Sequence, residues 1–255
     1  MPKAEGRRPR QDAHVKSDDD LNETKTPKGP RVGLMKAIVI NGSPRKNRNT
    51  ATLLEYALNG CRAGGATGEM VHLYDHKYQG CISCFRCKEL GTKTFGRCAV
   101  RDELTPILDR AGEADIVILG SPIYQHCETG MMRAFMERFI YQYSSFPDPD
   151  VHSIFPRKIQ TAVVYTMNAP EEATAYLYQD TSVAASCCTM RCTFGNCEAF
   201  QAFNTYQFND LPIYMSADSK PALLAAGKAK RREEVFPQDC ERAYQLGMRL
   251  AVAAQ

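Results

Sequence analysis

The segment Lys36–Thr50, KAIVINGSPRKNRNT, carries residue types suited to binding an anion. An apolar, β-branched run typical of a buried strand ends at Asn41-Gly42, where glycine lets the backbone turn sharply and approach a ligand. A helix that begins near Asn49 or Thr50, capped by either side chain, would add free amides and a positive dipole end. Neutral donors and cations fill the segment between, namely Ser43, Arg45, Lys46, Asn47 and Arg48. We therefore predict a phosphate-binding loop, the alternative being an ordinary polar strand-to-helix loop.

The composition around this loop narrows the class of ligand. No Asp or Glu occurs from Thr24 to Leu54, as expected where a phosphate dianion must be held. The segment has neither the GxGxxG pattern nor the Walker A pattern, which disfavours the dinucleotide and nucleoside-triphosphate folds.

A second loop, Gly120–His126 (GSPIYQH), is suited to a flat ligand. Pro122 stiffens the backbone, Tyr124 can stack on a planar ring, and His126 can supply a hydrogen bond or a proton. The alternative is a turn that carries a surface tyrosine and a satisfied histidine.

Four cysteines form a third feature, Cys81-x2-Cys84-x2-Cys87-x10-Cys98. Iron-sulfur clusters take four cysteine ligands, whereas structural zinc sites usually combine two separate CxxC units or add histidine. Eleven cysteines without a secretion signal favour reduced thiols or metal ligation over disulfides. The spacing alone does not decide between an iron-sulfur cluster, a zinc ion and inert thiols. We assign no role to the irregularly spaced Cys187, Cys188, Cys192 and Cys197.

The elements that must position these residues alternate between strand and helix. Such alternation predicts an α/β fold with a parallel sheet covered by helices on both faces, and ligands bind beyond the carboxyl ends of its strands. The loops after Ile40, Leu119 and Tyr165 should then converge on one site. We predict strands at 37–40, 69–74, 115–119, 158–165 and 197–203, and helices at 51–63, 102–112, 131–143, 171–179 and 238–254.

Composition indicates one domain with a tail. At 255 residues and 44% hydrophobic content, one sizeable core is expected over residues 35–255, and the polar segment 1–34 is expected to be a disordered tail. A net charge of +3 is too small to indicate nucleic acid or an acidic membrane as a partner. With no secretion signal and no apolar run long enough for a membrane span, we expect a cytoplasmic protein.

Taken together, the motifs resemble a known family. NGSPRKNRNT, GSPIYQHCETGMMRAFMER, YTMNAPEE and FPQDCERAYQLGMRLA are similar to the NADPH-dependent FMN reductase and iron-sulfur flavoprotein group, over residues 35–251. The resemblance implies a flavodoxin-like three-layer sandwich with a central parallel sheet. It also implies an FMN phosphate site at Ser43, Arg45, Asn47, Asn49 and Thr50, a flavin-ring loop at Pro122, Ile123, Tyr124 and His126, and a third flavin loop at Met167 and Asn168.

The resemblance implies an oxidoreductase in which FMN accepts electrons from NAD(P)H and passes them to a small flavin, quinone or aromatic compound. No catalytic side chain is predicted, because hydride transfer to a flavin needs no acid or base. The alternative is an electron carrier between redox proteins, with a [4Fe-4S] cluster held by Cys81, Cys84, Cys87 and Cys98. The last gap of this motif is longer than in the family's cluster-bearing members. A homodimer or higher homo-oligomer is expected by the same resemblance.

Overall fold

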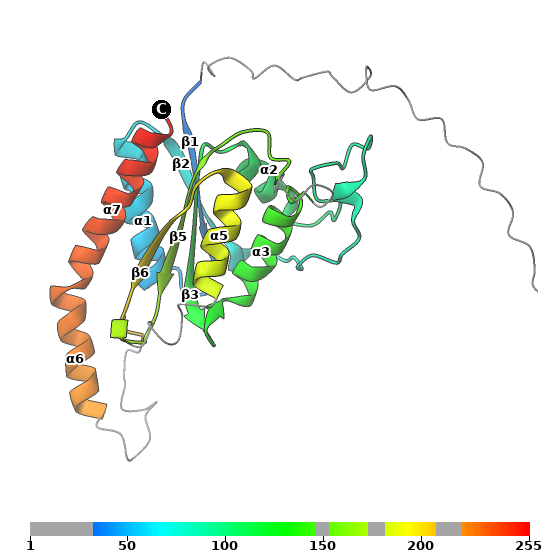
Figure 1. Ribbon diagram of the computed structural model, residues 1–255. Helices are drawn as coiled ribbons and strands as arrows, with labels where there is room; N and C mark the ends of the chain where they lie inside the picture. The colour runs from blue at the N-terminus through cyan, green and yellow to red at the C-terminus, as the bar shows by residue number, and fades with distance from the viewer. Residues whose placement is uncertain (1–32, 146–152, 173–181, 208–220) are drawn as a thin grey trace, which may run out of the picture. The chain divides into compact units, whose positions relative to one another are not determined.

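Five parallel strands form the central sheet of the computed structural model, in the order β2-β1-β3-β5-β6 (Figure 1). The chain runs from β1 outward to β2 and then crosses to β3 on the other side of β1, which is the flavodoxin-like strand order. The predicted α/β fold with a parallel sheet is therefore confirmed. The strands are β1 (Lys36–Asn41), β2 (Thr67–His72), β3 (Ile116–Tyr124), β4 (Cys127–Glu128), β5 (Gln160–Thr166) and β6 (Glu198–Ala202), with β4 antiparallel to β3.

The structure describes residues 33–145, 153–172, 182–207 and 221–255. The predicted tail lies almost entirely outside these ranges, so the division at residue 34 stays a prediction. The helices are α1 (Asn49–Ala63), α2 (Thr105–Glu113), α3 (Gly130–Tyr141), α5 (Ser182–Phe194), α6 (Pro221–Glu234) and α7 (Phe236–Ala253), with short 3-10 turns at Leu73–Asp75 and Arg86–Lys88. Within the described ranges, no helix combines the length and the apolar character that crossing a membrane would require.

Side chains of β1, β3 and β5 alternate between two apolar layers. Ala37 and Val39 of β1 pack in the layer under α1 and α7, whereas Ile38 and Ile40 pack in the layer under α2, α3 and α5. This period of two is what a strand buried on both faces requires. Figure 1 shows α1 and α7 on one side of the sheet and α3 and α5 on the other, so the three-layer arrangement is also as predicted.

Three elements differ from their predictions. Strand β3 continues through Gly120-Ser121-Pro122 to Tyr124, because Pro122 still pairs in register with Thr166 and Ile123 pairs with Glu128 of β4. Helix α5 was missed, since small, hydroxyl and thiol side chains make up most of its length. Helix α6 was missed as well. Residues 171–172 are helical, and the rest of the helix predicted at 171–179 lies outside the described residues.

Helices α1 and α7 pack with their backbones in direct contact. A Cβ atom added to Gly247 would lie 1.9 Å from the Ala57 carbonyl oxygen, and one added to Gly60 would lie 2.0 Å from the Tyr244 carbonyl oxygen. Only glycine permits such an approach, so these two positions fix how close the two helices come to each other.

We expect Gly247→Ala to lower the free energy of unfolding by about 1–3 kcal/mol or more, since the added methyl must push the two helices apart. Urea unfolding followed by circular dichroism measures the change. Gly227→Ala on α6 is the matched control, because a Cβ there meets no atom within 4 Å and alanine favours the helix by about 0.5–1 kcal/mol. Equal stability of the two variants would contradict the packing described.

Candidate functional site

The loops that follow β1, β3 and β5 are joined by direct hydrogen bonds. The Gly42 amide donates to the Gly120 carbonyl over 2.8 Å, which ties the first loop to the second. The hydroxyls of Thr50, in the first turn of α1, and Thr166, at the end of β5, lie 2.7 Å apart and tie the first loop to the third. The convergence predicted from the strand order is thus present.

Side chains of the first loop hold its own backbone in place. Asn41 Oδ1 accepts a hydrogen bond from the Ser43 amide at 2.9 Å, and Ser43 Oγ accepts one from the Arg45 amide at 3.2 Å. Asn41 and Ser43 are both buried. The path of the loop is therefore set before any ligand arrives.

Gly42 is required for a different reason from the predicted one. It is not among the described glycines with a positive φ, so the turn itself does not demand glycine. A Cβ at this position would instead lie 2.7 Å from Met132 Cβ. The Gly42 carbonyl also accepts from Thr129 Oγ1 at 2.7 Å, and Thr129 caps α3, so the first loop lies directly against the start of that helix.

The first turn of α1 has no side-chain cap. Helix α1 begins at Asn49 with Arg48 as its N-cap, and Arg48 makes no side-chain capping bond, so the prediction that Asn49 or Thr50 would cap the helix is wrong. Thr50 is held by Thr166 instead, and Asn49 Nδ2 donates to the Tyr206 carbonyl at 2.9 Å. No acidic residue lies in this turn, so the positive end of the helix dipole is not offset there.

Cations approach the first loop from two parts of the chain. Arg45, in the loop itself, donates from Nη1 to the Gln207 carbonyl at 2.6 Å. The uncharged side chain of Asn47, two residues later, is exposed. Arg232 of α6 donates from Nη1 to Asn49 Oδ1 at 2.9 Å and lies over the Phe236 ring, and burial lowers its pKa. Sequence reasoning missed Arg232, because nothing local connects it to a loop 183 residues earlier.

The second loop is a tight hairpin between β3 and β4. Tyr124 pairs with Cys127, and the two turn residues Gln125 and His126 have φ values of 48° and 67°. Two successive left-handed residues are typical of a type I′ turn, which usually takes Asn or Gly, so this hairpin is strained. Pro122 and Ile123 are buried, while Tyr124 is 41% exposed at the tip.

A buried carboxylate, which the sequence did not single out, anchors this hairpin. Glu128 Oε1 accepts hydrogen bonds from Tyr165 at 2.5 Å and from Ser186 at 2.6 Å. Burial and the nearby Glu128 raise the pKa of Tyr165, so its hydroxyl stays a donor. Glu128 thereby connects the second loop to β5 and α5.

The third loop is held by the segment that follows β6 and by α6. Met167 is buried, and its carbonyl accepts from the amide and hydroxyl of Thr205 at 2.9 Å and 3.0 Å. Asn168 is exposed, and its carbonyl accepts from Lys228 Nζ at 2.8 Å. Lys228 also donates to Asn204 Oδ1 at 3.1 Å, so α6 contacts this loop as well as the first one.

The four cysteines of the predicted metal motif line one small pocket, together with residues of α3 that include Arg138 and Tyr141. Cys87 is buried, Cys84 is exposed, and Cys81 and Cys98 are intermediate. Among the described residues, no three His, Cys, Asp or Glu side chains are close enough to hold a single metal ion. Ser83 and Phe85, between the cysteines, have φ values of 52° and 57°, which is strained for non-glycine residues.

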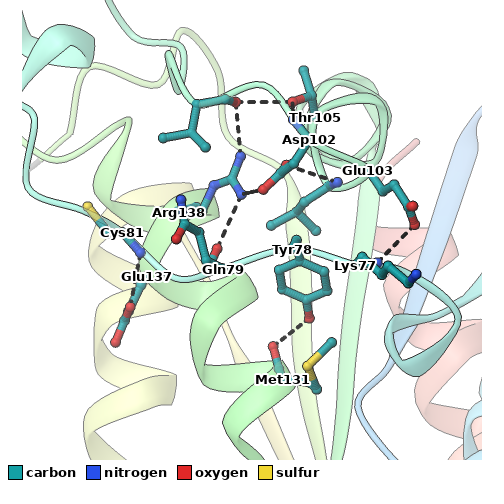
Figure 2. A network of polar contacts seen from close by, with 12 residues as sticks. Lys77, Tyr78, Gln79, Cys81, Asp102, Glu103, Thr105, Met131, Glu137 and Arg138 are labelled. Carbon is teal, nitrogen blue, oxygen red and sulfur yellow. Dashed lines mark hydrogen bonds and ion pairs between the residues drawn. The ribbon is translucent and has the colours of Figure 1, made fainter.

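Two cations lie beside these thiols. Lys88 donates to the carbonyls of Tyr141 and Ser144 at the end of α3. Burial raises the pKa of the neighbouring Cys87 thiol, and the charge of Lys88 opposes that rise. Figure 2 shows the second cation, Arg138, bonded to Asp102 and to the backbone at both ends of the cysteine segment.

Comparison with known proteins identifies the family and the fold of this chain. Residues 35–199 match the family described as NADPH-dependent FMN reductase. An iron-sulfur flavoprotein from Methanocaldococcus jannaschii is 38% identical over 104 residues, which are 41% of this chain and 51% of that protein. One from Archaeoglobus fulgidus is 32% identical over 144 residues, 56% of this chain and 60% of that protein. The chain thus spans about half the length of the relatives it matches.

Solved structures show the same fold at low sequence identity. An azoreductase from Bacillus anthracis has a TM-score of 0.57 at 13% identity, with 85% of this chain and 100% of that protein covered. An NAD(P)H:quinone oxidoreductase from Methanothermobacter marburgensis has a TM-score of 0.55 at 15% identity, with 86% and 96% covered.

Lys228 makes a pH-dependent contribution to stability. Burial, with a smaller effect of Arg231, lowers its pKa to about 8, whereas an unfolded lysine keeps its proton to about pH 10.4. Between these two pH values the unfolded state binds more protons than the folded state, so the free energy of unfolding increases with pH. We expect the Lys228→Met variant to lack this increase in the free energy of unfolding, measured by urea unfolding between pH 7.5 and 10. The difference from the parent protein should be modest, because the Lys228 side chain is partly exposed.

The matched control is Lys230→Met, two residues along α6, where the lysine is exposed and lies 3.9 Å from Glu234. It should keep the pH profile of the parent protein. Identical profiles for Lys228→Met and the parent would contradict the role of burial at Lys228.

Proposed function

Because the chain belongs to the NADPH-dependent FMN reductase family, we propose that it binds FMN at the three joined loops and passes electrons from NAD(P)H to a small acceptor. Flavins, quinones and aromatic compounds are the acceptor classes. One observation carries the proposal: the loops after β1, β3 and β5 meet where the strand order reverses, beside an α1 terminus with no acid and no side-chain cap. Ligands of open parallel sheets bind at this position.

The donors present fit a phosphate group at the first loop. Ser43, Arg45, Asn47, Asn49 and Thr50 remain our proposed phosphate residues, with Arg232 added from the structure. The buried Asn41 and Ser43 fix the backbone, and the amides at the start of α1 supply donors of the kind that bind phosphate. The charge of Arg232, close to Asn49, favours an anion at this point.

The second and third loops would contact the flavin ring. Pro122, Ile123, Tyr124 and His126 are proposed to lie along one side of it, and Met167 and Asn168 along another. The strained hairpin is held by Glu128 from inside the protein, so these residues keep their positions without help from a ligand. When bound, FMN supplies the hydride and electron chemistry, and the protein supplies orientation.

A second function, electron transfer through a cluster, is proposed from the cysteine segment. Four thiols line one pocket, and four cysteines are the donor set of a [4Fe-4S] cluster. Glu137 also lines this pocket, but its Oε2 accepts a hydrogen bond from the Cys81 amide at 3.2 Å. A single zinc ion would need its sulfurs about 2.3 Å away, which the described ligands do not offer, whereas a four-iron cluster spreads its ligands farther apart. Relatives named iron-sulfur flavoproteins support the same assignment.

We expect anaerobic addition of NADPH or NADH to the purified protein to remove the visible absorbance of bound oxidised flavin. Iron and sulfide analysis of the same sample reports the cluster. A flavin that stays oxidised with both nucleotides would overturn the reductase proposal. Stoichiometric absence of iron would overturn the cluster and leave the flavin assignment standing.

Thr50→Val should weaken FMN binding by about 5- to 10-fold, because valine keeps the shape but removes one hydroxyl from the first turn of α1. Quenching of flavin fluorescence during titration measures the dissociation constant. Thr52→Val is the matched control, since Thr52 Oγ1 donates back to the Arg48 carbonyl at 3.2 Å within the same helix. Equal affinities for the two variants would exclude Thr50 from the phosphate site.

A further inference from the structure

Arg138 is a fully buried cation at the wall of the cysteine pocket. Its side chain is 0% exposed, and it reaches the pocket from the last turn of α3. Its charge is paired with Asp102, whose Oδ2 lies 2.5 Å from Nη1. A guanidinium buried this deeply is costly unless each of its donors is used, so its contacts indicate its role.

The hydrogen bonds of Arg138 close both ends of the cysteine segment. Nη1 donates to the Gln79 carbonyl at 3.2 Å, two residues before Cys81, and Nη2 donates to the Val100 carbonyl at 3.1 Å, two residues after Cys98. Figure 2 shows these contacts meeting at one guanidinium. Arg138 therefore holds the start and the end of the four-cysteine segment against a single helix.

One nitrogen of this guanidinium has no partner among the described residues. Arg138 Nε is buried and has no hydrogen-bond partner within the described part of the chain. Cys98 and Arg138 line the same pocket. An unpaired buried N–H beside a cysteine is suited to an anionic sulfur acceptor.

Two other cations near the cysteine segment, Lys88 and Arg97, are differently placed. The Lys88 ammonium donates to the Tyr141 and Ser144 carbonyls at the end of α3, and it lies 4.7 Å from the centre of the Tyr141 ring. Arg97, next to Cys98 in sequence, is about half exposed and forms its ion pair with Asp109. Arg138 is thus the cation that combines full burial with an unused donor at the cysteine pocket.

We propose that Arg138 is a positioning residue of the cysteine site, which closes the segment through its backbone contacts and donates its Nε–H to a sulfur of a bound [4Fe-4S] cluster. The inference rests on the cluster proposed above. Hydrogen bonds to cluster sulfurs and nearby positive charge stabilise the reduced, more negative cluster, so Arg138 should raise its reduction potential.

The test compares Arg138→Lys, Arg138→Met and the control Arg97→Gln with the parent protein after anaerobic reconstitution with iron and sulfide. Iron and sulfide per chain and the cluster potential from a spectroelectrochemical titration are measured, with FMN content and circular dichroism as folding checks. We expect Arg138→Lys, which keeps the charge but loses the planar set of donors, to shift the potential to lower values. Arg138→Met should shift it further or lose iron, and Arg97→Gln should match the parent.

The possible results distinguish the role of Arg138 from the presence of the cluster. A parent protein that takes up no iron overturns the cluster, and this inference with it. A parent that takes up iron, together with Arg138 variants of unchanged iron content and potential, overturns only the role of Arg138. If Arg138→Met fails the folding checks, Arg138→Lys decides alone, because it keeps the buried charge opposite Asp102.

Discussion

Parallel pairing between β1 and β3 is the constraint on which the candidate flavin site depends. Because both strands end at the same edge of the sheet, the Gly42 amide reaches the Gly120 carbonyl. The loop after β1 is therefore in direct contact with the end of β3. Met132 at the start of α3 leaves no room for a Cβ at Gly42, and Thr129 binds its carbonyl. A loop held by these three contacts would need little reorganisation to bind the proposed phosphate group.

The cysteine segment depends on a different kind of interaction. Its one regular element is a short 3-10 turn. It packs against α3 through the polar contacts of Arg138 and Lys88 and through the edge-to-face contact of Phe85 with Tyr141. Burying a charged side chain costs free energy. In the proposed cluster site the buried charge would also act on the cluster. The same helix has Thr129 as its N-cap and Tyr141 at its end, so α3 connects the proposed flavin loops to the thiol pocket.

Residues near the C-terminus complete the first and third loops. Lys228 and Arg232, one helical turn apart on α6, contact the Asn168 carbonyl and the Asn49 side chain. Helix α7 then packs tightly on α1 through Gly60 and Gly247. The helix that carries the proposed phosphate site is therefore supported by residues far along the chain.

The strand pattern, the loop positions and their convergence were readable from the sequence, because apolar periodicity and the ends of parallel strands are local or follow from topology. What Gly42 and Asn49 do was not readable, since Met132 and Arg232 reach them only in the folded chain. The hairpin at Gln125-His126 was hidden by residue types that rarely form such a turn. The cysteine spacing indicated ligands, but it could not identify Arg138 as the cation that closes the segment, because that contact forms only when α3 packs beside it.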